Sequence, residues 1–384
     1  MNIENQNHTL ESLLETVRDQ SARKVDYIAQ TDSLQVRTVE RETGNETQVI
    51  LEADGGEPTK VLTANGVAFD QMTTKAGLDV RTGRRLQEHY PDVLDHALNR
   101  IHQQESRSAM LRTFDDSLSL GGGTLRAVVS DKFKTFDNPD LLEAVLPTLI
   151  ESDADWQIVN AQITDRRLYA RFKSLAITGE GSAVGDLMAQ GVVVGNSETG
   201  HGSVSVAQLV WTLACLNGMQ TANKNRTAHL TSSRSDGDTW AMLTDESKRL
   251  DNAALSSKLR DVTAAYASRD MFESVLEQFR NAAADVVSNG MMAAQPAVEA
   301  LGGILKLSKA ETSSVLDGLM RTIQQPGYVG QPLSRATMVN AVTAAAHGAD
   351  ADSVSDWHAL GGKVLDLPAN QWSAVASVPV AMAA

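Results

Sequence analysis

The sequence predicts an α+β protein: an antiparallel sheet with a β–β–α–β–β core packed by helices, followed by a helical C-terminal region. Three observations carry that prediction. Segments 108–136 and 156–177 each hold two β-rich stretches around a turn. A helical stretch with its own start signal lies between them. The alanine-rich stretch 243–326 has helical periodicity. Hairpins followed by a run of helices are typical of the α+β class.

The first hairpin and its helix are marked by turn and capping residues. We expect a strand at 109–114, a glycine-containing loop and a return strand at 124–136. Asn138 is expected as the N-cap of the following helix, with Pro139 at its first position. That helix should run to about residue 150, with leucine and valine on one side.

A second antiparallel pair is expected at 156–164 and 167–177. The block 191–206 comes next, with valines on both sides of a turn rich in Gly, Ser, Asn and His. So many small residues indicate close backbone approach or positive φ. The spacing matches neither a P-loop nor a dinucleotide fingerprint, so the role of this block stays open. The apolar run 207–219 is interpreted as a buried helix.

Shifts in composition divide the chain into four regions. The first is an acidic arm with a weak hairpin, and the second is the α+β core, which begins with helical periodicity over 66–106. A helical region and a closing helical unit come after the core. The predicted boundaries are 1–65, 66–235, 236–330 and 331–384.

Composition excludes several classes of protein. A formal charge of −14 and a pI near 5.0 argue against a uniformly basic nucleic-acid coat. Most of the acidity lies outside 101–235, so a local basic stripe stays possible there. The single cysteine, Cys215, excludes an intramolecular disulfide. The start lacks the features of a signal peptide, and no run of apolar residues is long enough to cross a membrane. We therefore expect a soluble protein of a bacterial host cytoplasm.

The clearest electrostatic pattern lies on the second strand of the second pair. Alternation over 167–173 puts Leu168 and its apolar neighbours on one face and two arginines, a tyrosine and a lysine on the other. Cations interleaved with an aromatic ring suit single-stranded nucleic acid, because the cations neutralise phosphates and the ring stacks on a base. The alternative is an ordinary solvated face. The four polar-face residues are Arg167, Tyr169, Arg171 and Lys173.

Two further basic segments extend this hypothesis. One falls on the predicted return strand of the first hairpin, and the other is a polar stretch after the predicted buried helix, where a strand clamp and a plain surface loop are both plausible. These add the candidate nucleic-acid-binding residues Lys132, Lys134, Lys224, Arg226, His229 and Arg234.

Other chemistry is less favoured by the sequence. His201 has only Glu198 nearby, and a turn histidine bonded to backbone is the simpler interpretation. Paired aspartates such as Asp115 and Asp116 sit at expected turns, where local hydrogen bonding explains them. No catalytic residue, cofactor or metal ligand is therefore predicted.

Several segments together resemble a known family. The block 191–206, with 74–94, 110–138 and two C-terminal segments, resembles the phage- and plasmid-encoded family catalogued as domain of unknown function 932. The resemblance covers roughly residues 70–375 and supplies no agreed catalytic residues to transfer. It also suggests similarity to Rad52-like single-strand annealing proteins of mobile elements. The two C-terminal segments are 333–343 and 360–367.

The sequence supports three classes of function. The first is a non-enzymatic single-stranded-DNA-binding and annealing protein of a phage or plasmid. Close-packing alanines and methionines in 243–326 predict a homo-oligomer. The second is an interaction protein whose acidic surface inhibits a host defence or regulatory factor. The third is an enzyme with a site around Asn196, Glu198 and His201.

Overall fold

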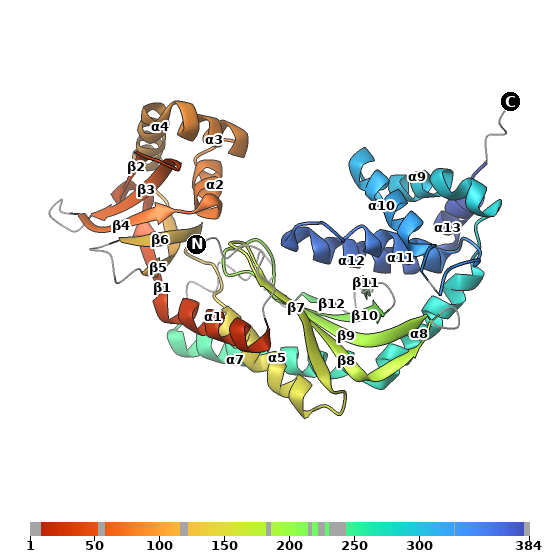
Figure 1. Cartoon of the computed structure of the whole chain (residues 1–384). Coiled ribbons are helices and arrows are strands. Elements are labelled where there is room, and N and C mark those ends of the chain that lie inside the picture. The colour runs from red at the N-terminus through yellow and green to blue at the C-terminus, as the bar shows by residue number, and fades with distance from the viewer. Residues whose placement is uncertain are drawn as a thin grey trace.

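The computed structural model contains two six-stranded sheets, with helices on both (Figure 1). The N-terminal sheet forms one lobe, and the second sheet carries the C-terminal helices on one side and α5 and α7 on the other (Figure 1). The residues described by the structure are 9–52, 58–115, 122–181, 186–213, 217–221, 227–229, 243–325 and 327–379.

The N-terminal sheet is ordered β1-β5-β6-β4-β3-β2, antiparallel except for the β4–β6 pair. Its edge strands β1 and β2 are joined by the short 3₁₀ turn η1 (Thr31–Ser33). A link of three residues cannot cross a flat sheet of six strands, so the sheet must curl. The strands are β1 (Lys24–Gln30), β2 (Leu34–Arg41), β3 (Gly44–Glu52), β4 (Pro58–Ala64), β5 (Ser108–Asp115) and β6 (Gly122–Ser130).

Three helices fill the curl: α2 (Gly66–Lys75), α3 (Val80–His89) and α4 (Pro91–Gln104). Their starts follow local rules, since Asn65 caps α2 and Pro91 opens α4. Helix α4 also covers the β2 edge. Asn99 accepts from the Val36 amide at 2.8 Å and donates to the Val36 carbonyl at 2.7 Å. These bonds satisfy backbone groups that a free edge strand would expose.

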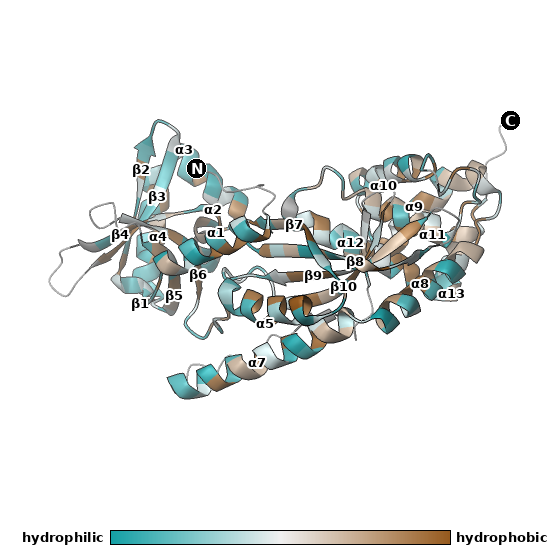
Figure 2. Cartoon of the chain, turned by 60° about the horizontal axis from the view of Figure 1, so that its bottom comes forward, coloured by the Kyte–Doolittle hydropathy of each residue, from teal (hydrophilic) through white to brown (hydrophobic). Residues whose placement is uncertain are grey.

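The second sheet is ordered β11-β10-β9-β8-β7, with β12 also paired to β10. On one face, α1 (Leu10–Arg23), α5 (Asn138–Glu151) and α7 (Asp245–Tyr266) bury an apolar cluster that includes Leu168, Ala170 and Phe172. Strands β9 and β10 are mainly hydrophobic, whereas α7 alternates polar and apolar residues along its length (Figure 2). The strands are β7 (Trp156–Ile163), β8 (Leu168–Glu180), β9 (Leu187–Asn196), β10 (Ser205–Thr212), β11 (Asn217–Gln220) and β12 (Thr227–His229).

The C-terminal helices form the largest apolar cluster and pack on the other side of the second sheet (Figure 1). Helix α11 is buried along its whole length, and α12 packs on it and on β11. Gly361 permits this, because a Cβ there would lie 2.4 Å from the Thr343 side chain of α11. The elements are α8 (Arg269–Ala284), η2 (Gly290–Ala293), α9 (Ala294–Leu305), α10 (Lys309–Thr322), α11 (Arg335–Ala344), α12 (Ala351–Leu365) and α13 (Ala369–Ala376).

The α+β class and the C-terminal helices are confirmed, but the single β–β–α–β–β core is not found. The two predicted hairpins lie in different sheets, with α5 between them in the chain. The N-terminal residues expected as a peripheral arm supply four strands of the first sheet. Long-range pairing explains this, since β1 pairs with β5 across 24–30 and 108–114.

Three local predictions are also wrong. The return strand β6 ends at Ser130, so Lys132 and Lys134 lie on the connection to α5. The cap of α5 is Asp137, whose side chain forms a capping box with Asp140. The run 207–219, expected as a helix, is the strand β10 followed by β11, and Cys215 lies outside the described residues.

Candidate nucleic-acid interface

The candidate interface is the face of β8 that carries Tyr169 and Arg171. The predicted alternation is correct, because Leu168, Ala170 and Phe172 belong to the cluster on the opposite face. The alternative, an ordinary solvated face, is not found at the centre of this face. Tyr169 is 4% exposed and Arg171 is 2% exposed. The Arg171 guanidinium donates to the Ser355 hydroxyl of α12 at 2.7 Å, so α12 covers the centre of this face.

A cavity of about 260 Å³ remains between this face and α12. Residues of β8, β9, β10, β11 and α12 line it. Two cations, Arg167 and Lys363, line it together with one carboxylate, Asp356. The other lining residues are Tyr169, Val193, Val194, Gly195, Ser205, Gln220, Thr221, Ser355 and Ala359.

Arg167 is held at the cavity by the turn between β9 and β10. Its Nε donates to the His201 carbonyl at 2.6 Å, and its Nη1 lies 3.2 Å from the Tyr169 hydroxyl. Gly202 makes room for this approach, since a Cβ there would lie 2.5 Å from Arg167 Nη2. Within the described residues, neither Arg167 nor Lys363 forms an ion pair.

Arg171 is a buried cation whose described partners are all neutral. Its Nη1 donates to Asn160 Oδ1 at 3.1 Å, its Nη2 donates to Ser355, and its Nε has no hydrogen-bond partner among the described residues. The guanidinium lies 5.5 Å from the centre of the Tyr169 ring. Desolvation lowers the pKa of Arg171 to about 10. The group therefore stays charged at neutral pH, in a place where charge is costly.

The histidines near this region are neutral at pH 7. Burial, with the charge of Arg171, lowers the pKa of His358 on α12 to about 3. Burial and the neighbouring arginines Arg166 and Arg167 lower the pKa of His201. His201 hydrogen-bonds locally, with its amide donating to the Ser197 hydroxyl at 2.8 Å. This agrees with the interpretation of His201 as a turn histidine.

Of the other candidate residues, those whose side chains are described do not line this cavity. Lys134 forms an ion pair with Asp251 of α7, the helix on the opposite face of the sheet. Lys132 is exposed on the connection before α5, and Lys173 is partly exposed on β8. His229 lies on β12, where only its backbone is described. Outside the described residues are Lys224, Arg226 and Arg234.

The turn of the 191–206 block joins the two sheets, which answers the question that the sequence left open. The Glu198 carboxylate pairs with Arg126 of β6 at 2.9 Å and accepts from the Asn138 amide at 2.8 Å. The Thr199 carbonyl accepts from Gln71 of α2 at 2.7 Å. Asn196 donates to the Phe136 carbonyl at 2.9 Å. Asn196 and Glu198, two of the three residues considered for an enzyme site, therefore take part in this junction.

Arg112 of β5 lies at the centre of the same junction. Its side chain is fully buried, and it pairs with Asp137 at 2.7 Å and Asp26 at 3.2 Å. It also donates to the Glu198 carbonyl at 2.8 Å. Desolvation acts to lower the pKa of Arg112, but Asp137 and Asp26 outweigh it and the pKa is raised. Desolvation likewise opposes ionisation of Asp137, yet Arg112 and Lys24 hold its pKa below its usual value.

Sequence reasoning missed the residues that α12 and the strand ends bring to the cavity. Ser205, Thr221 and Ser355 supply hydroxyl groups, and Lys363 supplies the second cation. Lys363 comes directly after the pair Gly361-Gly362, and such a pair inside a helix indicates close packing. No local signal identifies the strands on which that helix packs.

Cations, hydroxyls and a tyrosine ring around a cavity of this size suit an anion such as a backbone phosphate. Asp356 reduces the net positive charge of the cavity. No group of three or more potential metal ligands occurs among the described residues. Within the same part of the chain, no helix is both long and apolar enough to span a bilayer.

Comparison with known proteins gives one family. Residues 126–291 match the model of a domain of unknown function, number 932 in its series, and the match supports that family for this part of the chain. The matched stretch runs from β6 to η2 and includes β8, β9 and β10. No curated protein and no solved structure matches significantly.

Proposed function

We propose that this chain is a single-stranded-DNA-binding and annealing protein of a phage or plasmid, acting in recombination or replication. The observation that carries the proposal is the cavity beneath α12. Two cations without ion-pair partners among the described residues line it, and Arg171 of β8 bonds Ser355, another lining residue. Each of these charges gains from a phosphate nearby.

The DNA strand would contact the cavity through its phosphate backbone rather than lie flat on β8. Tyr169 is too buried for a base to stack on its ring, so the ring positions Arg167 through its hydroxyl. Phosphate contacts of this kind carry no sequence information, which suits a protein that pairs strands of any sequence. Annealing needs no cofactor, because base pairing drives it. A homo-oligomer would line up several such cavities on one strand and raise avidity.

Fluorescence anisotropy with a labelled oligothymidine tests the proposal. We expect tighter binding to the single strand than to duplex, with affinity that falls steeply as salt rises. Lys363→Gln should reduce the slope of log affinity against log salt by about 0.7, the value for one phosphate on a single strand. Lys258→Gln, the same change on the exposed surface of α7, serves as the matched control.

Undetectable binding at low salt, or an unchanged slope in Lys363→Gln, would contradict the proposal. The second candidate function is inhibition of a host defence or regulatory factor, and the charge of −14 favours it. Light scattering with and without oligonucleotide separates the two. A monomeric mass in both states would remove cooperative annealing and leave the inhibitor as the better account.

A further inference from the structure

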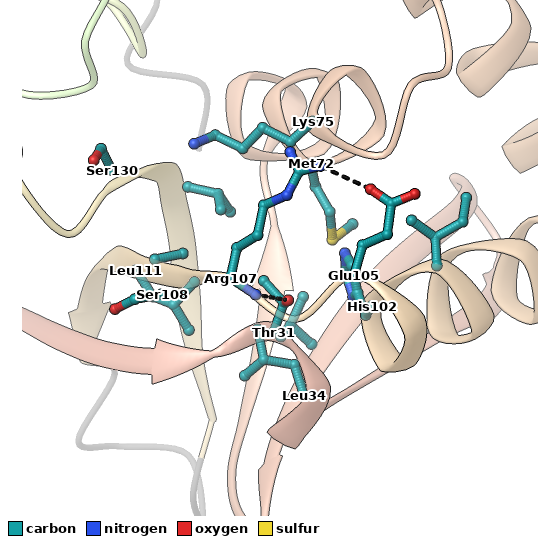
Figure 3. A pocket seen from close by; sticks show the side chains of 14 residues that line it. Thr31, Leu34, Met72, Lys75, His102, Glu105, Arg107, Ser108, Leu111 and Ser130 are labelled. Atoms are coloured by element: carbon teal, nitrogen blue, oxygen red, sulfur yellow. Dashed lines mark hydrogen bonds and ion pairs between the residues drawn. The ribbon is translucent and has the colours of Figure 1, made fainter.

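The curled N-terminal sheet encloses a second cavity, of about 220 Å³. It lies between α2 and α4 on one side and the inner surface of β2, β3, β5 and β6 on the other (Figure 3). Its lining comes from the N-terminal lobe alone. This cavity is therefore separate from the one beneath α12, and a ligand bound in it would be independent of the proposed function.

The inner wall of the cavity is apolar. Leu34, Val49, Met72 and Leu111 belong to the core cluster of the lobe and also line the cavity. Thr31, in the short turn η1 between β1 and β2, also lines the cavity. An apolar wall of this kind favours a ligand with a hydrophobic body.

One buried polar atom in the wall lacks a partner. His102 of α4 is 8% exposed, and its Nδ1 is fully buried with no hydrogen-bond partner among the described residues. Burial lowers the pKa of His102, so the imidazole is neutral and each ring nitrogen can act only as a donor or only as an acceptor. The imidazole lines the cavity, so it is available to hydrogen-bond with a polar group of a ligand there.

The rim of the cavity is cationic. Lys75 extends from the end of α2, and Arg107 reaches in from the residue before β5 (Figure 3). Arg107 is paired with Glu105 at 2.7 Å, whereas Lys75 forms no ion pair with any described residue. Burial on the cavity side and then the charge of Arg107 lower the pKa of Lys75, against a smaller opposite effect of Asp131. An anion at the rim would offset this cost.

We propose that this cavity binds a small organic anion whose apolar body is about the size of one aromatic ring. The acid group would lie at the Lys75 ammonium, and a polar group at the other end would hydrogen-bond with the His102 imidazole. The volume sets the size, since pockets for drug-sized ligands are typically about 300–1,000 Å³ and this cavity is smaller.

A set of three probes tests each part of this assignment on the full chain. The probes are 4-hydroxybenzoate, which has both polar ends, benzoate, which lacks the hydroxyl, and 4-hydroxybenzyl alcohol, which lacks the charge. Ligand-observed NMR titration gives their relative affinities. We expect 4-hydroxybenzoate to bind most tightly and the other two to bind more weakly.

Two variants assign the contacts. Lys75→Gln should weaken the binding of 4-hydroxybenzoate about fivefold, the effect expected for a partly exposed ion pair. It should leave the affinity for 4-hydroxybenzyl alcohol unchanged. His102→Phe should abolish the difference between 4-hydroxybenzoate and benzoate. Lys258→Gln on α7 should change none of these affinities.

Failure of 4-hydroxybenzoate to bind the wild-type chain at millimolar concentration would overturn the assignment. An affinity for 4-hydroxybenzoate that Lys75→Gln leaves unchanged would overturn it as well. Lys75 is exposed at the end of α2, so this variant should fold even if His102→Phe does not. The oligonucleotide assay is independent of both residues, so the proposed function and this assignment can fail separately.

Discussion

Two buried arginines in this protein have opposite surroundings. Arg112, at the junction of the sheets, is paired with Asp26 and Asp137, and those carboxylates raise its pKa. Arg171, beneath α12, has only Asn160 and Ser355 as described hydrogen-bond partners, and desolvation lowers its pKa to about 10. A paired buried cation stabilises the arrangement that pairs it, whereas an uncompensated one is costly and calls for another explanation.

This difference distinguishes residues that hold the fold together from residues that we propose to bind DNA. The charged residues of the junction form ion pairs with one another, and these pairs hold the two sheets together. The region beneath α12 keeps positive charge without described carboxylate partners beside a cavity. We therefore expect changes at the junction to affect folding, and changes beneath α12 to affect binding.

The largest effect should come from Arg112→Met. This change leaves Asp26 and Asp137 without their central partner, and breaking a buried pair from one side costs about 3–5 kcal/mol. The free energy of unfolding, from urea denaturation followed by circular dichroism, checks it. A loss below about 1 kcal/mol would show that the junction does not depend on this pair.

The pH dependence of stability should be concentrated at α12. The pKa of His358 is about 3 in the folded chain and near 6.5 when unfolded, so the unfolded state binds more protons between these values. Stability is therefore full above about pH 6.5 and falls as pH drops, by up to about 1.4 kcal/mol per unit. His358→Phe keeps a ring beside Trp211 and should flatten that part of the curve. Parallel curves for the two proteins between about pH 6 and 4 would rule this out.

Loss of binding without loss of stability is expected for Arg167→Gln. Arg167 is only partly buried and forms no ion pair within the described chain. The free energy of unfolding should therefore change by less than about 1 kcal/mol. The affinity for oligothymidine should fall about tenfold, the effect of losing one charge-assisted bond of about 1.5 kcal/mol. Anisotropy titration measures this affinity. An unchanged value would mean that the DNA strand does not bind at Arg167.

The smallest effect should come from Asp251→Ala, which breaks the ion pair of Lys134 at the surface of α7. The Asp251 side chain is 48% exposed, and such pairs contribute about 0.2–1 kcal/mol. Thermal unfolding of this variant provides the surface reference for Arg112→Met. A loss as large as that of the buried pair would erase the contrast between the two environments.

Local signals predicted much of the fold. The periodicity over 66–106 corresponds to α2, α3 and α4, and the strands of both hairpins fall close to their predicted places. Pairing over long distances could not be read from the sequence. The partners of β1 lie about 80 residues or more away on β5, and polar residues such as Thr47 and Gln48 are buried in β3, so the N-terminal stretch resembled an exposed arm.

Periodicity also has a limit at the candidate site. The pattern separated the two faces of β8 correctly, but alternation cannot distinguish a face that meets solvent from one that meets a helix. Strand β10 shows the related problem. It is buried on both faces, so its nearly continuous apolar run looks like a buried helix.

The most direct test measures stability and binding on a single variant, Arg171→Met, with Arg112→Met beside it. We predict that the free energy of unfolding of Arg171→Met lies within about 1 kcal/mol of the wild-type value, because a costly charge is replaced by a flexible apolar side chain. We also predict that the affinity for oligothymidine falls about tenfold, because the positive potential near the cavity is lost. Unchanged affinity together with a loss of about 3 kcal/mol or more, as expected for Arg112→Met, would make Arg171 a structural residue and contradict the account.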